Sequence, residues 1–242
     1  MDIIDVNTLF GAYPSRHPDS TAEALVETMS ANGVAYSLTL STLGLFHQHG
    51  VGNEETIDAC TRLGPLVPVA TIDPRGFWGA AGMVESLTKT FEMFRFFPHD
   101  QGWPVDYEPF RDVLDAIMAA NARPIMISVR QPGDISRTAR VTSSFTNPII
   151  LEGVSPDTIA EAISVMNRND NIYIETHALR SPAAMALLAD TVGLGRVLFG
   201  SDAPGLSLAA ALRYVRGAGL SESDQAKVLG GNASAIWQGG AA

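Results

Sequence analysis

The chain has 242 residues, a formal net charge of −10, 46% hydrophobic residues and one cysteine, Cys60. This length and composition fit a globular protein with a sizeable core, built as one large α/β domain or two small ones. The acidic balance argues against nucleic acid as a partner, because phosphate binding needs clustered Lys and Arg. We expect no intrachain disulfide, because the chain has one cysteine. We expect no membrane association and a cytoplasmic location, because the sequence shows no apolar run long enough to cross a membrane and no signal-peptide pattern.

Short β-rich runs alternate with helical patterns from end to end of the chain. The expected strands are rich in Val, Ile, Leu and Phe without strict polar alternation, which is typical of parallel strands covered on both faces. They span residues 3–6, 36–40, 67–72, 93–97, 124–129, 148–151, 171–176 and 196–199. Helical patterns span residues 22–30, 54–63, 110–120, 158–166 and 183–191, and closing helices are expected at 206–216, 222–229 and 231–237.

Eight strands joined by helical crossovers predict a single α/β domain over residues 1–242, folded as a (β/α)8 TIM-type barrel. Residues 130–147 are rich in Ser, Thr and Arg without a clear amphipathic period, so we expect the fifth crossover helix to be short or missing. A doubly wound open sheet is the competing fold. It is disfavoured because no Gly-x-Gly-x-x-Gly follows the first strand.

In such a barrel the active site is built at the carboxyl ends of the strands and in the loops that follow them. All five histidines fall at those places, and none is expected on a helix; they are His17, His47, His49, His99 and His177. Polar loops tolerate histidine without function, but this clustering favours a catalytic mouth. His177 directly follows a buried strand, and its ordinary pKa near neutrality suits an acid or a base.

Asp202 ends the last hydrophobic strand and is followed by Ala203-Pro204, so we expect its carboxylate at the mouth of the barrel. A buried carboxylate must be hydrogen-bonded, ion-paired or metal-bound. The alternative role is a cap for the helix that follows. We predict Asp202 and His177 as the catalytic residues and treat Asp5 as a structural contact within the first strand.

Two arginines are candidates for binding an anionic substrate. Arg95 lies within the fourth strand, where it is either paired to an acid or open to a substrate carboxylate, which its planar fork binds bidentately. Arg130 ends the fifth strand and has the same two alternatives. Together with Asn7, His47 and His99, these arginines form the predicted substrate-binding set.

Six segments resemble, in the same order, the amidohydrolase-related branch of the amidohydrolase superfamily. They read IIDVN (3–7), VATIDPR (69–75), RFFP (95–98), NIYIET (171–176), LFGSDAP (198–204) and GNA (231–233). Each segment is weak alone, but the ordered set is fairly specific and covers nearly the whole chain. The branch includes hydrolases, lactonases and non-oxidative decarboxylases, so the resemblance implies an enzyme.

The resemblance also implies where a metal site would lie. The family draws ligands from two histidines of strand one, one histidine after strand five, one after strand six and the aspartate of strand eight. The corresponding places hold Asn7, Leu9, Ser128, Gly153 (or Glu152, with the alignment moved by one) and Asp202. Only the aspartate is retained. Because a catalytic divalent site needs about three protein ligands, we expect no metal cofactor.

Several alternatives stay open. A divalent ion at a non-standard site of His47, His49, His177 and Asp202 is conceivable. The function ranked first is metal-independent hydrolysis of a small, anionic lactone or ester, because water and a general base can open such bonds. A decarboxylase ranks second and would be supported by an arginine facing a protonated carboxyl. A non-catalytic barrel that binds a small molecule or a protein ranks third, and a homo-oligomer is possible.

Overall fold

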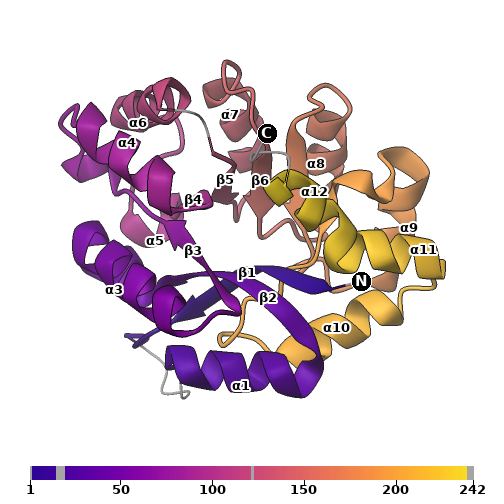
Figure 1. Ribbon diagram of the computed structural model, residues 1–242. Coiled ribbons are helices and arrows are strands. Elements are labelled where there is room, and N and C mark those ends of the chain that lie inside the picture. Colours follow the sequence, from indigo (N-terminus) through magenta and orange to yellow (C-terminus); the bar gives the residue numbers. More distant parts are fainter. Residues whose placement is uncertain (1, 15–19, 121–122, 239–242) are drawn as a thin grey trace.

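The computed structural model describes residues 2–14, 20–120 and 123–238 of the chain. Its strands pair in parallel and in chain order. They are β1 (Ile3–Phe10), β2 (Val34–Ser41), β3 (Leu66–Ala70), β4 (Met93–Phe96), β5 (Ile125–Ser128), β6 (Ile149–Glu152), β7 (Ile172–Glu175) and β8 (Val197–Leu198). Past β8 the chain runs beside β1, where the Val6 amide donates to the Phe199 carbonyl and the Leu9 amide to the Ala203 carbonyl, both at 2.9 Å. The sheet thus closes on itself, which confirms the predicted (β/α)8 barrel (Figure 1).

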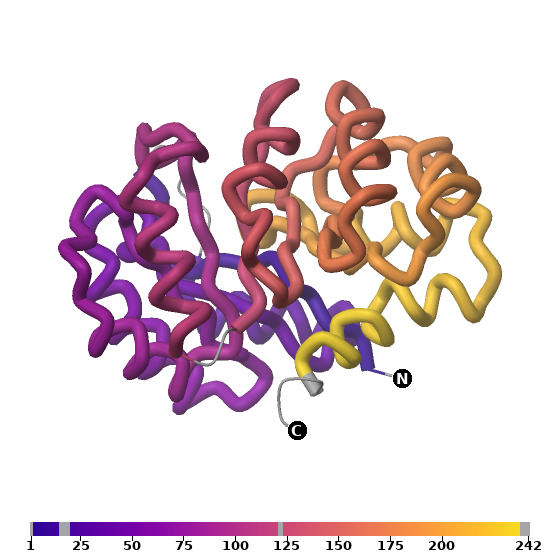
Figure 2. Tube along the Cα trace, turned by 90° about the horizontal axis from the view of Figure 1, so that it is seen from above, coloured from indigo at the N-terminus to yellow at the C-terminus, as the bar shows by residue number. Residues whose placement is uncertain are grey.

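Helices cover the outside of the barrel (Figure 1). They are α1 (Ala22–Asn32), α2 (Thr42–Phe46), α3 (His49–Arg62), α4 (Ala81–Thr90), α5 (Pro98–Gln101), α6 (Glu108–Ala119), α7 (Asp134–Val141), α8 (Ile159–Met166), α9 (Pro182–Thr191), α10 (Leu208–Arg216), α11 (Glu222–Ala226) and α12 (Asn232–Gln238), with the short turns η1 (Pro74–Gly76), η2 (Leu194–Arg196) and η3 (Lys227–Gly231). Figure 2 shows the outer helices following one another around the molecule in chain order. The fifth crossover helix, α7, has 8 residues and is short, as predicted.

The segment between the expected strand at 36–40 and the expected helix at 54–63 is helical, although no helix was expected there. The Ser41 side chain accepts a hydrogen bond from the Leu43 amide and starts α2, and α3 begins at His49. Gly52 lies so close to the backbone of Gly44 that a Cβ could not fit between the two helices. His49, and His99 on α5, therefore lie on helices, contrary to the expectation that no histidine would.

The core has two layers. Alternate residues of the strands point inward and form one apolar cluster, which includes Val6, Leu40, Met126 and Ile150. The other residues of the strands pack outward against the helices in a second cluster, which includes Phe110 of α6. At the amino ends of the strands, α12 packs against the inner cluster and closes that end of the barrel. None of the described helices is long and apolar enough to cross a membrane.

Candidate active site

The carboxyl ends of β4, β6 and β7 bring a connected group of polar side chains together with β1 and the turn after β8. Four members are buried, and His177 and Asp202 are partly buried; the group consists of Asn7, Arg95, Glu152, Glu175, His177 and Asp202. Asn7 and Glu175 are 0% exposed, Arg95 is 1% exposed and Glu152 is 7% exposed. Such burial requires each charge to have a partner.

The Arg95 guanidinium is paired to an acid. Its Nε donates to Glu152 Oε2 at 2.9 Å, and its Nη2 donates to Glu152 Oε1 at 2.7 Å. The same Nη2 donates to Asn7 Oδ1 at 2.7 Å, and Nη1 donates to the Thr8 carbonyl at 3.2 Å. Of the two roles considered for Arg95, the geometry favours pairing to an acid over an open fork for a substrate carboxylate.

The His177 imidazole is held by Glu175, the last residue of β7. His177 Nδ1 lies 2.6 Å from Glu175 Oε1, and the His177 amide donates to Glu175 Oε2 at 2.8 Å. Because an ionised carboxylate only accepts hydrogen bonds, Nδ1 carries a proton and Nε2 is the atom left for chemistry. Burial opposes the charged imidazolium, but the charge and hydrogen bond of Glu175 outweigh it and raise the pKa of His177 to about 9.

Asn7 links the two pairs. Its Oδ1 accepts from Arg95, which fixes the amide so that Nδ2 lies 3.3 Å from His177 Nδ1. With Nδ1 protonated toward Glu175, both of these nitrogens are donors, so this contact is packing and not a hydrogen bond. Asn7 thus lies in the mouth as a hydrogen-bonding residue for the guanidinium.

Asp202 follows β8 in the left-handed backbone region, with φ 57. Its amide donates to the Asn7 carbonyl at 2.9 Å, which fixes the turn against β1. Burial raises the pKa of the Asp202 carboxyl to about 6, with His177 and Arg95 opposing the rise and Glu152 adding to it. Aspartate tolerates this backbone conformation better than most residues, and strained residues concentrate at functional sites.

Asp5 connects the first and last strands beneath this group. Its Oδ1 accepts from the Asn7 amide at 3.1 Å and from the Ser201 amide at 3.0 Å. The residue is 0% exposed, and burial raises its pKa to about 7. These contacts fit the structural role expected for Asp5.

Two other predicted substrate contacts lie around α5 and α7. His99 Nε2 lies 2.7 Å from Asp134 Oδ2, and the Arg130 guanidinium pairs with Asp100 at 2.5 Å. Within the described residues, no hydrogen bond or ion pair joins His99 or Arg130 to the Arg95–His177 group. Arg130 keeps about half of its side chain exposed (53%) and so remains accessible to a ligand.

His47, the last predicted substrate contact, lies in a separate hollow. Together with His49, Asp73 and Asp100 it lines a cavity of about 240 Å³. Burial lowers the pKa of His49, with Asp73 opposing this shift. His17 and the loop around it fall outside the described residues.

The family's metal ion does not fit the donors present. The described residues contain no group of three or more His, Cys, Asp or Glu side chains that could hold an ion, and the set of His47, His49, His177 and Asp202 is not such a group. At the ligand places, Leu9 has no donor atom, and the side-chain oxygens of Asn7 and Glu152 are bound to Arg95. We therefore derive no step through a metal.

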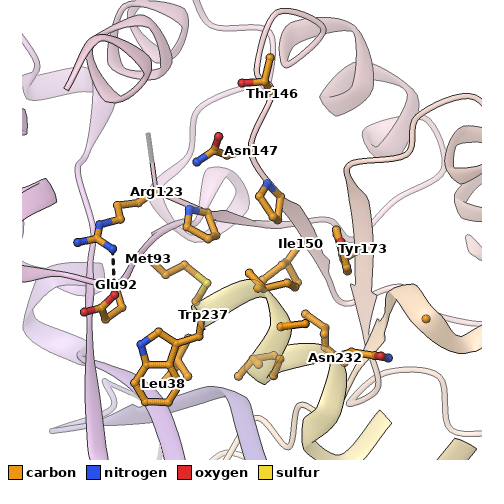
Figure 3. A pocket seen from close by; sticks show the side chains of 18 of the residues that line it. Leu38, Glu92, Met93, Arg123, Thr146, Asn147, Ile150, Tyr173, Asn232 and Trp237 are labelled. Carbon is orange, nitrogen blue, oxygen red and sulfur yellow. Dashed lines mark hydrogen bonds and ion pairs between the residues drawn. The ribbon is translucent and has the colours of Figure 1, made fainter. Parts of the chain in front are cut away.

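A second cavity lies at the opposite end of the barrel, beside α12 (Figure 3). Its volume is about 670 Å³, and Met93, Ile150, Tyr173 and Trp237 line it. Its two charged lining residues, Glu92 and Arg123, are paired with each other at 3.1 Å. Catalytic groups of (β/α)8 barrels lie at the carboxyl ends of the strands, so this cavity is not the candidate active site.

Glu152 and Glu175 are site residues that the sequence placed at the mouth without giving them a role there. The signal was available, because each acid ends a run of buried apolar residues. Their partners lie too far away to be found by spacing, since Glu152 and Arg95 are 57 residues apart.

Comparisons with known proteins agree with this fold. The family model described as amidohydrolase matches residues 7–238. A 5-carboxyvanillate decarboxylase from Novosphingobium aromaticivorans, complexed with manganese, has a TM-score of 0.77 at 13% identity, covering 98% of this chain and 96% of its own. A probable 2-pyrone-4,6-dicarboxylic acid hydrolase from Acinetobacter baumannii has a TM-score of 0.77 at 12% identity, covering 98% and 100%. An uncharacterised TIM-barrel protein from Bordetella bronchiseptica has a TM-score of 0.80 at 16% identity, covering 100% of both chains. No curated protein matches the chain.

Proposed function

Because the chain belongs to the amidohydrolase family, we propose that it hydrolyses a small lactone or ester by acid–base catalysis at Asp202 and His177. The observation that carries this proposal is the pairing of opposite protonation states in one buried site. Between pH of about 6 and about 9, Asp202 is an ionised base and His177 a protonated acid. Hydrolysis needs both at once.

The reaction proceeds by attack of water on the acyl carbon. The Asp202 carboxylate takes a proton from the water as its oxygen bonds to that carbon. The bond from carbon to the leaving oxygen then breaks, and the imidazolium of His177 gives its Nε2 proton to that oxygen. The products are a carboxylic acid and an alcohol, joined in one molecule when the substrate is a lactone.

The charges of the site favour a neutral acyl group at its centre. Two cations, Arg95 and His177, face the carboxylates of Glu152, Glu175 and Asp202, which leaves one formal negative charge. We propose that a substrate carboxylate binds away from this group, at Arg130, whose side chain is 53% exposed and paired with Asp100. His47 and His99 stay predicted contacts of the same substrate, and a homo-oligomeric state stays a prediction.

Decarboxylation is the second candidate, because solved structures similar to this chain include decarboxylases of aromatic acids. It would use a protonated Asp202 to deliver a proton to the ring carbon as carbon dioxide leaves. Arg95 does not offer a free fork to a substrate carboxylate at the centre of the described site, since this fork is bound to Glu152.

The pH dependence of turnover separates the two reactions. Dihydrocoumarin and p-nitrophenyl acetate serve as the lactone and ester, and 2,6-dihydroxybenzoate serves as the acid. For hydrolysis, kcat/KM rises through pH of about 6 and falls through about 9. Release of carbon dioxide at a rate that falls as the pH rises through about 6 would favour the decarboxylase instead.

A variant pair tests the base. Asp202→Asn is expected to lower kcat/KM for the lactone by about 10²-fold or more, while Asp190→Asn, on the exposed face of α9, leaves it unchanged. Equal turnover by both variants would remove Asp202 from the mechanism. Absence of turnover with every probe would favour the non-catalytic barrel.

A further inference from the structure

We propose that the Arg95 guanidinium is the permanent cation of this active site and stands in place of the family's divalent ion. This role rests on the metal-independent chemistry proposed above. Arg95 Nη2 donates to Asn7 Oδ1, at one of the family's ligand places, at 2.7 Å. Its Nε and Nη2 donate to Glu152, the alternative to Gly153 at another ligand place, at 2.9 and 2.7 Å. Its charge also attracts the carboxylate of Asp202, the ligand aspartate that the chain retains.

The guanidinium is built into the barrel wall. A guanidinium has five N–H donors, and four of them are bound to Glu152, Asn7 and the Thr8 carbonyl. Arg95 is 1% exposed, and the Phe97 ring lies 4.8 Å from its Cζ. Rotation of the Arg95 side chain out of this position would leave Glu152 as an unpaired buried carboxylate, which is costly.

This arrangement makes Arg95 a positioning residue. It does not touch the catalytic His177, but it holds the Asn7 amide, and Asn7 Nδ2 packs at 3.3 Å against His177 Nδ1. The chain thus replaces an exchangeable ion with a covalently attached one and keeps the oxygens at those two places neutralised.

The wild-type protein gives the first test. We expect purified protein to contain far less than one equivalent of Zn, Mn or Fe, and its unfolding midpoint to stay unchanged when Mn²⁺ or Zn²⁺ is added. About one equivalent of tightly held metal, or a saturable rise of the midpoint with either ion, would overturn the proposal. This test uses only the wild-type protein, so it does not depend on whether a variant folds.

Removal of the guanidinium gives the second test. Arg95→Ala leaves Glu152 buried beside Asp202 without a cation, and we expect the midpoint to fall by on the order of 10 °C. Millimolar guanidinium chloride is expected to restore part of that loss, since the free ion can occupy the vacated space and pair with Glu152. Sodium chloride at the same concentration should not.

Arg196 supplies the matched control. Its Nη1 donates only to backbone carbonyls, at Met166, Asn169 and Ile172, so Arg196→Ala leaves no carboxylate unpaired. Rescue of Arg95→Ala but not of Arg196→Ala by guanidinium supports the proposal, and equal responses of the two variants overturn it. If Arg95→Ala does not fold, Arg95→Lys, which keeps the charge, must fold and must still bind no Mn²⁺.

These measurements test the role of Arg95 as the site cation independently of the hydrolase proposal. Midpoints and metal content do not depend on turnover, so loss of the hydrolase proposal would leave the cation assignment intact. Conversely, a wild-type protein that binds Mn²⁺ and hydrolyses lactones would overturn the role of Arg95 and keep the hydrolase.

Discussion

The pKa values of His177 and Asp202 are both raised, so both groups make the folded protein less stable as the pH rises, each in its own range. The pKa of His177 is raised to about 9, so the imidazolium stabilises the fold below its unfolded pKa of about 6.5, and this contribution is lost as the pH rises through about 9. The pKa of Asp202 is raised to about 6, so ionisation of this carboxyl costs stability above that pH. Between pH of about 6 and about 9, His177 is therefore charged and Asp202 is ionised, and the ionised carboxylate lowers the stability of the fold.

Gly200 is the residue that lets Glu175 reach His177. A Cβ at this position would collide with Glu175 Oε2 and would lie 3.0 Å from Glu175 Cδ and from Asn7 Cβ. We expect Gly200→Ala to lower the free energy of unfolding by about 1–3 kcal/mol and to lower the pKa of His177, as measured by denaturant unfolding and by the pH profile. Gly195→Ala is the control, since a Cβ there meets nothing within 4 Å. Equal effects of both substitutions would show that Glu175 has room to move.

At the scale of elements, the short helix α7 is held by residues outside it. Glu161 of α8 accepts from the Gly133 amide at 2.8 Å and from the Ser136 amide at 2.7 Å, at the start of α7. Asp134, the first residue of α7, accepts through Oδ2 from the amides of Arg130 and Gln131 in the turn before the helix. The bonds from Glu161 thus supply capping at the start of α7 that comes from another element.

We expect Glu161→Ala to lower the free energy of unfolding by about 1–2 kcal/mol, because two amides at the helix start lose their acceptor. Glu27→Ala, on the exposed face of α1, should change it little. The hydrogen bonds lower the pKa of Glu161 against the effect of its burial, so its contribution is present at neutral pH and is lost as the pH falls below the ordinary carboxyl range. Urea unfolding of the two variants at pH 7 and pH 3 checks this, and an undiminished difference at pH 3 would contradict it.

The elements themselves were largely predictable, because each buried strand is a continuous apolar run and most outer helices carry an apolar stripe. Helix α2 and the first residues of α3 were missed, since they are fixed by the Ser41 cap and by the contact of Gly44 with Gly52. At the site, Asp202 and His177 could be placed by their position after strands. The pairing of Arg95 with Glu152 could not, because the acid and the arginine come from β6 and β4 and only closure of the barrel brings them together.

At the scale of the whole molecule, α12 closes the barrel at the end away from the site. The Asn232 side chain donates to the Leu194 carbonyl at 2.7 Å and to the Val197 carbonyl at 2.8 Å, which ties this helix to the start of β8. The Trp237 ring packs edge-on against Tyr36 of β2, with centroids 5.7 Å apart. These contacts stabilise the barrel at the end that does not hold the candidate active site.

We expect Asn232→Ala to lower the free energy of unfolding by about 1–3 kcal/mol, because two buried carbonyls lose their donor. Since Asn232 lies at the amino ends of the strands, kcat/KM of the folded fraction should stay unchanged. Unfolding curves and lactone turnover of the same preparation check both parts. A loss of turnover larger than the loss of folded protein would place α12 in communication with the site.

The central claim is that His177 is a protonated acid beside an ionised Asp202 at neutral pH. Its most direct test is an NMR titration of labelled histidine side chains from pH 5 to 10, with the His177 signals assigned by their loss in His177→Gln. We expect a His177 midpoint of about 9, and a return toward the ordinary histidine range in Glu175→Gln. A His177 midpoint at or below about 6.5, with a neutral imidazole at pH 7.5, would contradict it.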